Sequence, residues 1–240
     1  MHMQQHGSAF TGEFFVPGCS GKWSEALHYA RYRFASQYAK GKSVLDIACG
    51  VGYGSHQLAL AGASSVVGVD ILADNVSFAQ RSYRLQNLHF VQGDITSFGE
   101  DQSYDLIVCF ETIEHVAQYN RALHNCRRLL RNKGCLIISS PDRRLSSPRN
   151  LLATDRPENP FHVREFTLSE LLLALEANGF SADETRYFGQ AYQPVFSSMI
   201  ITKAFRKLIV RPFASKEVKL NRHRRLLPNY FTVVAEAQGE

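Results

Sequence analysis

The chain has 240 residues, of which 45% are apolar and 20% charged, and it carries a formal net charge of +5. This composition is ordinary for a globular protein and excludes low-complexity and repeat architectures. No apolar run is long enough to predict a membrane helix and the start lacks the pattern of a signal peptide, so we expect one cytoplasmic domain with an appendage.

The first predicted elements are a helix, a buried strand and a glycine-rich turn. Apolar residues recur at helical spacing over residues 23–40, and Gly41 ends this pattern. Residues 43–48 read as a buried strand. The turn that follows contains Gly50 and Gly52, which let the backbone bend sharply and approach a ligand closely. A small molecule is therefore expected at this turn.

Carboxylates follow the second and third predicted strands. Residues 65–70 form an apolar strand that ends on Asp70, where an acid can accept hydrogen bonds from both hydroxyls of a ribose. Residues 88–92 repeat this layout, and Asp94 can accept from an adenine amino group while Ile95 packs on the ring. A solvated turn carboxylate is the alternative at both positions.

The remaining elements continue the alternation of strands and helices. A helix is predicted from Tyr119 to the Lys133–Gly134 pair, and a capping box at Thr167 opens another that runs to Asn178. Further strands are predicted at residues 104–110, 134–140, 185–189 and 230–236. This order predicts an α/β fold with a doubly wound, mostly parallel, seven-stranded sheet and ligands at the carboxyl ends of its strands.

We expect the chain to divide into four parts. An N-terminal arm and helix that cover the site occupy residues 1–42, and the ligand-binding core occupies residues 43–192. A basic amphipathic insertion follows at residues 193–228, and residues 229–240 return as the final strand of the core sheet. The five cysteines form no C-x-x-C pair, which favours reduced, packed thiols over disulfides or zinc.

A cluster of acids and imidazoles follows the fourth strand. If a helix begins there, Glu111 meets Glu114 one turn on and His115 at the i+4 position. His162, on the loop after the fifth strand, can reach the same crevice. Two carboxylates and two imidazoles suit magnesium, manganese, iron or zinc. Three alternatives stay open: His115 as a general base without metal, a structural role for the cluster, and a His162 bonded only to backbone.

These motifs together resemble the class I S-adenosylmethionine-dependent methyltransferases. The matching parts are the glycine-rich motif at residues 46–52, Asp70, the Asp94–Ile95 pair and the strand at residues 104–111. The one departure is Ala48, where the family usually has a glycine. A nicotinamide-binding domain shares the strand, turn and acid, but here the glycines recur at every second residue instead of following G-x-G-x-x-G.

The resemblance implies a Rossmann-like fold, S-adenosylmethionine as the methyl donor and a set of contacts. Arg31 would pair with the donor's methionine carboxylate, the alternative being a core helix arginine. The other implied donor-binding residues are Asp46, Ala48, Gly50, Gly52, Asp70, Ile71, Asp94, Ile95 and Phe110. Ubiquinone-pathway O-methyltransferases and enzymes that methylate small-RNA 2′-hydroxyls have a similar E-x-x-E-H cluster. Carried over, Glu111, Glu114, His115 and His162 would be metal ligands, with His115 and Glu111 catalytic.

A narrower likeness points to the acceptor. Residues 12–18, 28–35 and 159–167 resemble bacterial methyltransferases of surface-polysaccharide and natural-product pathways. The expected function is therefore O-methylation of a hydroxyl on a sugar, glycan or small metabolite. The alternatives are an RNA 3′-terminal 2′-O-methyltransferase, a small-molecule N-methyltransferase and a non-catalytic module that binds the donor.

The positive charge is concentrated near the C-terminus. Residues 203–225 contain nine Lys and Arg residues against one acid, Glu217, and apolar residues at helical spacing lie within or beside this segment. A helix packed on the sheet or on a second subunit, as in a homodimer, would explain this pattern. A peripheral membrane contact, a phosphate-bearing acceptor or nucleic acid are the functional alternatives. Nucleic acid is not favoured, because the sequence lacks an aromatic stacking platform.

Overall fold

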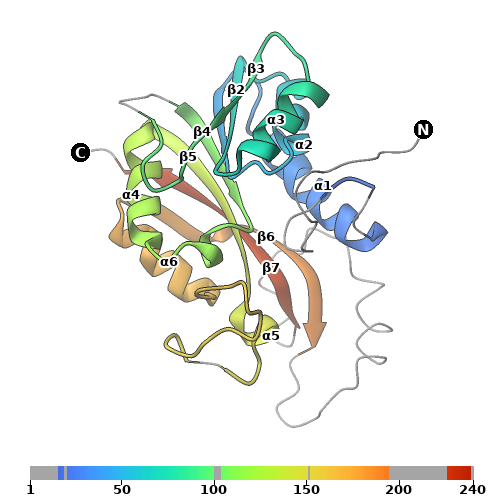
Figure 1. Ribbon diagram of the computed structural model, residues 1–240. Helices are drawn as coiled ribbons and strands as arrows, with labels where there is room; N and C mark the ends of the chain where they lie inside the picture. Colours follow the sequence, from blue (N-terminus) through green and yellow to red (C-terminus); the bar gives the residue numbers. More distant parts are fainter. Residues whose placement is uncertain (1–15, 19–20, 100–103, 151, 195–225, 239–240) are drawn as a thin grey trace.

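The computed structural model describes residues 16–18, 21–99, 104–150, 152–194 and 226–238, and these form one sheet covered by helices on both faces (Figure 1). Within these ranges the sheet has seven strands in the order β3-β2-β1-β4-β5-β7-β6. The strands β1 to β5 pair in parallel, and β7 runs antiparallel to both β5 and β6, so six strands share one direction. The predicted α/β fold with a mostly parallel sheet is thereby confirmed.

The strands begin close to where the sequence predicts them. Their bounds are β1 Ser43–Ile47, β2 Ser65–Asp70, β3 Leu88–Gln92, β4 Tyr104–Phe110, β5 Leu130–Pro141, β6 Phe180–Pro194 and β7 Leu226–Ala237. The strand order reverses between β1 and β4, which pair in parallel with Asp46 opposite Val108. Ligands of open α/β sheets bind beyond the carboxyl ends of strands at such a switch point.

The helices divide the hydrophobic core into two layers. The described helices are α1 Lys22–Ser36, α2 Tyr53–Leu60, α3 Ala73–Ser82, α4 Tyr119–Leu129, α5 Arg143–Ser146 and α6 Leu168–Ala177, with a 3₁₀ turn, η1, at Ile113–His115. Successive strand residues point to opposite faces, so Leu45 packs in the layer of α4 and α6, whereas Val44 packs in the layer of α1, α2 and α3.

Three predicted strands have wrong boundaries because strand pairing overrides the local pattern. The strand β6 is longer than the predicted residues 185–189, because residue 180 already pairs with residue 237 of β7 and residue 194 pairs with residue 226. The helix α4 ends at Leu129, and β5 begins at the next residue, where Leu130 pairs with Tyr104 of β4. Residues 130–133 are therefore strand and not helix. The last strand begins at Leu226, four residues before the predicted strand at residues 230–236, because residues 226–228 pair with the end of β6. Most of the predicted basic insertion, residues 195–225, lies outside the described residues.

The capping box that opens α6 is present as predicted. The backbone N–H of Glu170 donates to Thr167 Oγ1 at 3.3 Å, and the backbone N–H of Thr167 donates to Glu170 Oε2 at 2.9 Å. The other oxygen of Glu170 accepts from Arg143 Nη2 at 2.6 Å, which ties α6 to α5. In the described ranges, no helix combines the length and apolar character needed to cross a bilayer.

Candidate active site

The glycine-rich turn after β1 is built from left-handed backbone. Gly50 and Gly52 have φ of 57° and 84°, and Ala48 has φ of 61°, a region that costs a non-glycine residue about 1 kcal/mol. At Gly52 an added Cβ would lie 2.6 Å from the Cβ of Ala79, so packing as well as φ demands glycine. At Gly50 an added Cβ would meet no described atom within 4 Å. Gly50 therefore faces open space that a ligand can enter.

Asp46 holds this turn from the inside. Its buried carboxylate accepts a hydrogen bond from the Tyr32 hydroxyl at 3.1 Å and from Ser55 Oγ at 2.6 Å. Burial raises the pKa of Asp46 to about 7, although both hydrogen bonds act in the opposite direction. Both oxygens accept from protein groups, so Asp46 anchors α1 and α2 to β1.

Asp70 lies at the tip of β2, where the sequence predicts the ribose acid. Its Oδ2 accepts from the backbone N–H of Gly50 at 2.8 Å, so the acid and the glycine turn are directly linked. Its Oδ1 accepts from Leu72 N at 3.0 Å and from Asn75 Nδ2 at 3.1 Å. The next residue, Ile71, is 58% exposed. The structure thus brings together the Asp70 carboxylate, the glycine turn at Gly50 and the exposed apolar side chain of Ile71.

The adenine pair predicted at the tip of β3 is also in place. Asp94 Oδ1 accepts from the backbone N–H and the hydroxyl of Thr96 at 2.7 and 2.8 Å, which fixes the orientation of the carboxylate. Ile95 is buried, and its carbonyl accepts from Asn125 Nδ2 at 2.9 Å. Three neighbouring strand tips therefore carry the predicted donor contacts.

Arg31 is a buried arginine near the tip of β4. Only 1% exposed, it donates from Nη1 to Gln190 Oε1 at 2.9 Å, and its guanidinium lies over the Tyr230 ring at 5.3 Å. Its Nε has no hydrogen-bond partner within the described residues. A buried donor without a partner is costly, so this atom is a candidate contact for a ligand.

Glu111 lies beside Arg31 and is not part of the group formed by Glu114, His115 and His162. Its Oε1 lies 3.9 Å from Arg31 Nη1 and accepts from Ser139 Oγ at 2.6 Å. The backbone of Glu111 has φ of 48°, a strained value typical of residues at functional sites. Phe110, just before it, is buried and packs edge-on against the Tyr32 ring at 5.0 Å between centroids.

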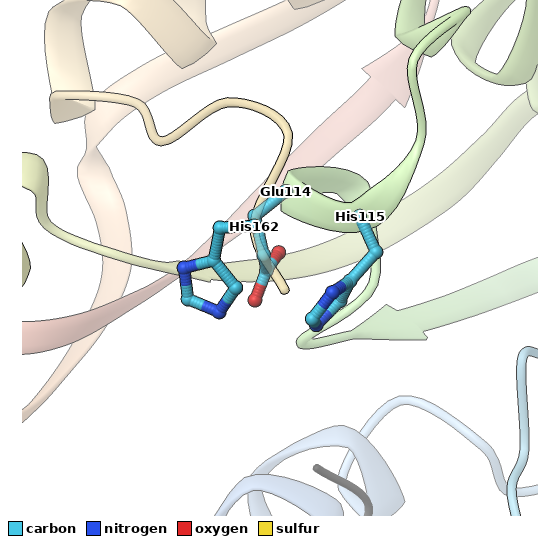
Figure 2. Close-up of side chains that lie close together, drawn as sticks. All are labelled: Glu114, His115 and His162. Carbon is cyan, nitrogen blue, oxygen red and sulfur yellow. The ribbon is translucent and has the colours of Figure 1, made fainter. Parts of the chain in front are cut away.

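Three of the four predicted metal ligands meet at one place. Figure 2 shows Glu114, His115 and His162, whose candidate ligand atoms all lie within 4.8 Å of one another. Glu114 is 1% exposed, and its Oε2 has no hydrogen-bond partner in the part of the chain that is described. Burial, and then the charge of Glu111, raise the pKa of Glu114 well above its usual value. A cation bound here would offset both effects.

The predicted helix at this point is only a 3₁₀ turn, and this explains why Glu111 is separate. Residues Ile113–His115 form η1, so Glu111 precedes the turn instead of lying one helical turn below Glu114. Glu111 therefore projects toward Arg31. One carboxylate and two imidazoles remain, a donor set that suits divalent zinc, iron or manganese and leaves further coordination positions open.

The loop after β5 is fixed against η1 through backbone and side chains. The N–H groups of Val163 and Arg164 donate to the Glu114 carbonyl at 2.8 and 3.1 Å. The His115 and His162 rings meet edge to face with centroids 4.8 Å apart. These contacts place His162 beside His115, as the sequence predicts.

Several residues of this site were not assigned a role from the sequence. Tyr32, Ser55, Ser139, Gln190 and Tyr230 contact the predicted residues, and Gln190 lies 159 positions from its partner Arg31. Sequence spacing contains no signal for contacts of this range. Glu165, whose Oε1 lies 2.6 Å from His162 Nδ1, was also not assigned a role. Here a local signal was present, because a carboxylate three residues after a candidate histidine can contact its ring.

Comparison with known proteins identifies the family of this chain. Residues 39–183 match a family model described as a methyltransferase domain. A probable S-adenosylmethionine-dependent methyltransferase of Mycolicibacterium smegmatis is 33% identical over 178 residues, which is 73% of this chain and 66% of that protein. The chain therefore spans slightly less than two thirds of this relative's length.

A ubiquinone biosynthesis O-methyltransferase of Glaesserella parasuis is 33% identical over 111 residues, covering 43% of this chain and 47% of that protein. Among solved structures, an S-adenosylmethionine-dependent methyltransferase from Mesorhizobium loti superposes with a TM-score of 0.61 at 17% identity. The match covers 89% of this chain and 99% of that one, and it supports the fold alone. The family match decides against the nicotinamide-binding alternative.

Proposed function

This chain belongs to the class I S-adenosylmethionine-dependent methyltransferases, and on that premise we propose that it methylates a hydroxyl oxygen of a sugar, glycan or related small metabolite. The observation that carries the proposal is the convergence of Glu114, His115 and His162 just past the tip of β4. This position adjoins the strand tips that hold the donor-binding residues, so a hydroxyl placed at the cluster would face the donor.

The donor's adenosine end fits the tips of β2 and β3. Asp70 would accept from the ribose hydroxyls, and Asp94 from the adenine amino group. Ile71 and Ile95 provide apolar surface for the ring, and Gly50 leaves room for close approach. When bound, S-adenosylmethionine supplies a methyl group on a positively charged sulfur, which makes that sulfur a good leaving group.

The donor's methionine end is a zwitterion, and the Arg31–Glu111 pair offers both complementary charges. The Nε of Arg31, which has no partner in the described structure, is suited to the donor's carboxylate. Glu111, 3.9 Å from that arginine, is suited to its amino group. We therefore assign Glu111 to donor binding in preference to metal binding or proton transfer.

On the acceptor side, His115 has the geometry of a general base. Its Nδ1 lies 3.0 Å from the Phe161 carbonyl, which can only accept, so Nδ1 carries the proton and Nε2 has a lone pair. As the acceptor oxygen bonds to the methyl carbon, the carbon–sulfur bond breaks and its electron pair stays on sulfur. The hydroxyl proton passes to His115 Nε2. Positioning of the two reactants supplies much of the remaining rate enhancement.

The same three side chains fit a divalent metal. Glu114 offers a buried carboxylate whose raised pKa a cation would lower, and both histidines offer an Nε2 lone pair. A bound metal would lower the pKa of the acceptor hydroxyl. Of the four metals predicted from the sequence, manganese, iron and zinc suit this donor set better than magnesium, which prefers oxygen ligands. The response to chelators separates the metal-assisted route from the metal-free one.

The experiment is methyl transfer from labelled donor to candidate sugars, glycans and cell extracts, with and without chelator and with each metal added back. We expect the label in methyl ethers, which resist mild acid and base. An RNA oligonucleotide with a free 3′ end tests the alternative acceptor. Methyl transfer to a nitrogen atom that is insensitive to chelator would overturn both the proposed hydroxyl acceptor and the proposed role of a metal.

Location and partners are proposals of the same kind. Cys49, Cys109 and Cys126 are buried thiols, which supports a reducing compartment such as the cytoplasm. We retain a peripheral membrane contact through the basic segment of residues 193–228, near a lipid-linked acceptor, and a homodimer as hypotheses for solution measurements.

A further inference from the structure

One tight turn contacts both histidines of the cluster. Asn159, Pro160, Phe161 and His162 form a β-turn closed by a hydrogen bond from His162 N to the Asn159 carbonyl at 3.1 Å. Proline occupies the second position, where its fixed φ favours the turn. The turn therefore has a defined shape before any ligand arrives.

The turn presents one group to each ring. The Phe161 carbonyl accepts from His115 Nδ1 at 3.0 Å. Asn159 Oδ1 accepts from the backbone N–H of Phe161 at 3.1 Å, which fixes the orientation of the amide. Asn159 Nδ2 then faces His162 Nε2 at 2.9 Å and donates to it. His162 Nε2 must therefore be an acceptor with a lone pair.

Glu165 determines that the other ring nitrogen of His162, Nδ1, carries the proton. Its side chain is fully buried, and Oε1 lies 2.6 Å from His162 Nδ1. Its Oε2 accepts from the hydroxyls of Ser146 and Ser147 at 2.5 and 2.7 Å. The carboxylate is thus held by α5 and the residue after it, and His162 Nδ1–H donates to it.

We propose that Glu165 and the turn at residues 159–162 are positioning elements that hold both imidazoles as the Nδ1–H tautomer. Both Nε2 lone pairs are thereby presented together with the Glu114 carboxylate. The Asn159 amide occupies His162 Nε2 until a metal or an acceptor hydroxyl replaces it. The catalytic meaning of this arrangement rests on the proposed function, whereas the tautomers can be measured independently.

The test is long-range proton–nitrogen NMR on ¹⁵N-histidine-labelled protein, with Glu165→Gln as the variant. Wild type should show the proton on Nδ1 of both His115 and His162. The side-chain amide introduced by E165Q can also donate to Nδ1, in competition with the donation from Asn159 to Nε2, so in this variant we expect a mixture of tautomers at His162 and no change at His115. The matched control is Glu158→Gln, because Glu158 lies in the same loop but pairs with Arg149 at 2.7 Å.

Manganese titration followed by electron paramagnetic resonance gives a second readout. Loss of a carboxylate behind a metal-binding imidazole weakens metal affinity by about 10-fold to 100-fold. We expect this loss in E165Q and wild-type affinity in E158Q.

The results separate the two proposals. A proton on Nε2 of either ring in the wild type overturns the inference even if E165Q fails to fold. An E165Q protein with wild-type tautomers and wild-type manganese affinity also overturns it. If the wild-type tautomers are as stated but the protein neither binds manganese nor methylates a hydroxyl, the positioning role stands and the proposed function fails.

Discussion

The donor side and the acceptor side of this molecule are built in different ways. At the adenosine end of the proposed donor site, contacts join residues close in sequence: Ser55 to Asp46, 9 positions apart, and Gly50 to Asp70, 20 apart. On the acceptor side, His115 contacts Phe161, 46 positions away. A short motif therefore encodes the adenosine end of the donor site, whereas the acceptor site exists only once β4, β5 and the following loop are assembled.

The two sides also differ in which atoms carry the function. The proposed donor binding depends on backbone shape at Ala48, Gly50 and Gly52 as well as on side chains. The proposed acceptor chemistry depends on Glu114 and on two imidazoles whose orientations are fixed by hydrogen bonds from a loop. Substitutions should therefore separate the two activities, and the following predictions test this separation from the largest expected effect to the smallest.

The largest effect is expected on the acceptor side. His115→Ala removes the proposed base or ligand and should reduce the turnover number about 100-fold to 10,000-fold, which corresponds to about 3–5 kcal/mol of the barrier. Donor affinity should stay within about threefold of wild type by calorimetry with S-adenosylhomocysteine, because His115 is not among the residues proposed to contact the donor. Parallel loss of turnover and donor affinity would contradict the separation.

On the donor side, Gly52→Ala should destabilise the fold by about 3 kcal/mol, because the new Cβ meets Ala79 and Phe90 in a left-handed conformation. Gly50→Ala is the matched control: its φ is similar, but its Cβ points into open space. It should cost about 1 kcal/mol of stability and weaken donor binding by about 10-fold or more. Urea unfolding and calorimetry measure these effects, and an equal loss of stability in both variants would argue against the packing explanation.

Asp46 should make the stability of the fold dependent on pH. Its pKa is about 7 in the fold, against an unfolded value of about 3.9, so the folded state binds more protons between these values. Stability should therefore fall as pH rises, by about 2 kcal/mol from this residue between pH 5 and pH 7. Asp46→Asn should remove this contribution, so the difference in unfolding free energy between variant and wild type should shift toward the variant as pH rises. A constant difference across this range would be inconsistent with the burial of an ionisable Asp46.

The smallest effect concerns Ala48. Glycine adopts φ of 61° without strain but loses more conformational entropy on folding, so Ala48→Gly should change stability by less than about 1 kcal/mol, in the stabilising direction. Thermal unfolding can detect this change. Donor affinity should be unchanged, and a loss of more than about 1 kcal/mol would mean that the Ala48 methyl group contributes packing.

The same contrast explains what the sequence could predict. The strand, glycine turn and acids at Asp46, Asp70 and Asp94 follow from local pattern, and so does the capping box of α6. The predicted grouping of Glu111 with Glu114 depended on a helix that is only a 3₁₀ turn. The start of β5 at Leu130 depended on pairing with Tyr104, which the local helical spacing conceals.

The partners of Arg31 show more clearly which contacts cannot be predicted from local sequence pattern. Gln190 and Tyr230 come from β6 and β7, and they meet an α1 side chain only because these strands fold back along the sheet. Loop closure over such distances leaves no periodic pattern in the sequence. By contrast, the loop segment from Asn159 to Glu165 contains its own turn residues, and its link to His115 required only the placement of one loop.

The central claim, that the donor extends from the tips of β2 and β3 to the Arg31–Glu111 pair with its sulfur facing the imidazole cluster, is tested most directly by a crystal structure with S-adenosylhomocysteine and manganese. The account predicts the product's amino acid end at Arg31 and Glu111. It also predicts an anomalous manganese peak bounded by Glu114, His115 and His162, with the sulfur facing that peak. A manganese site that includes Glu111, or a product whose sulfur faces away from the cluster, would contradict it.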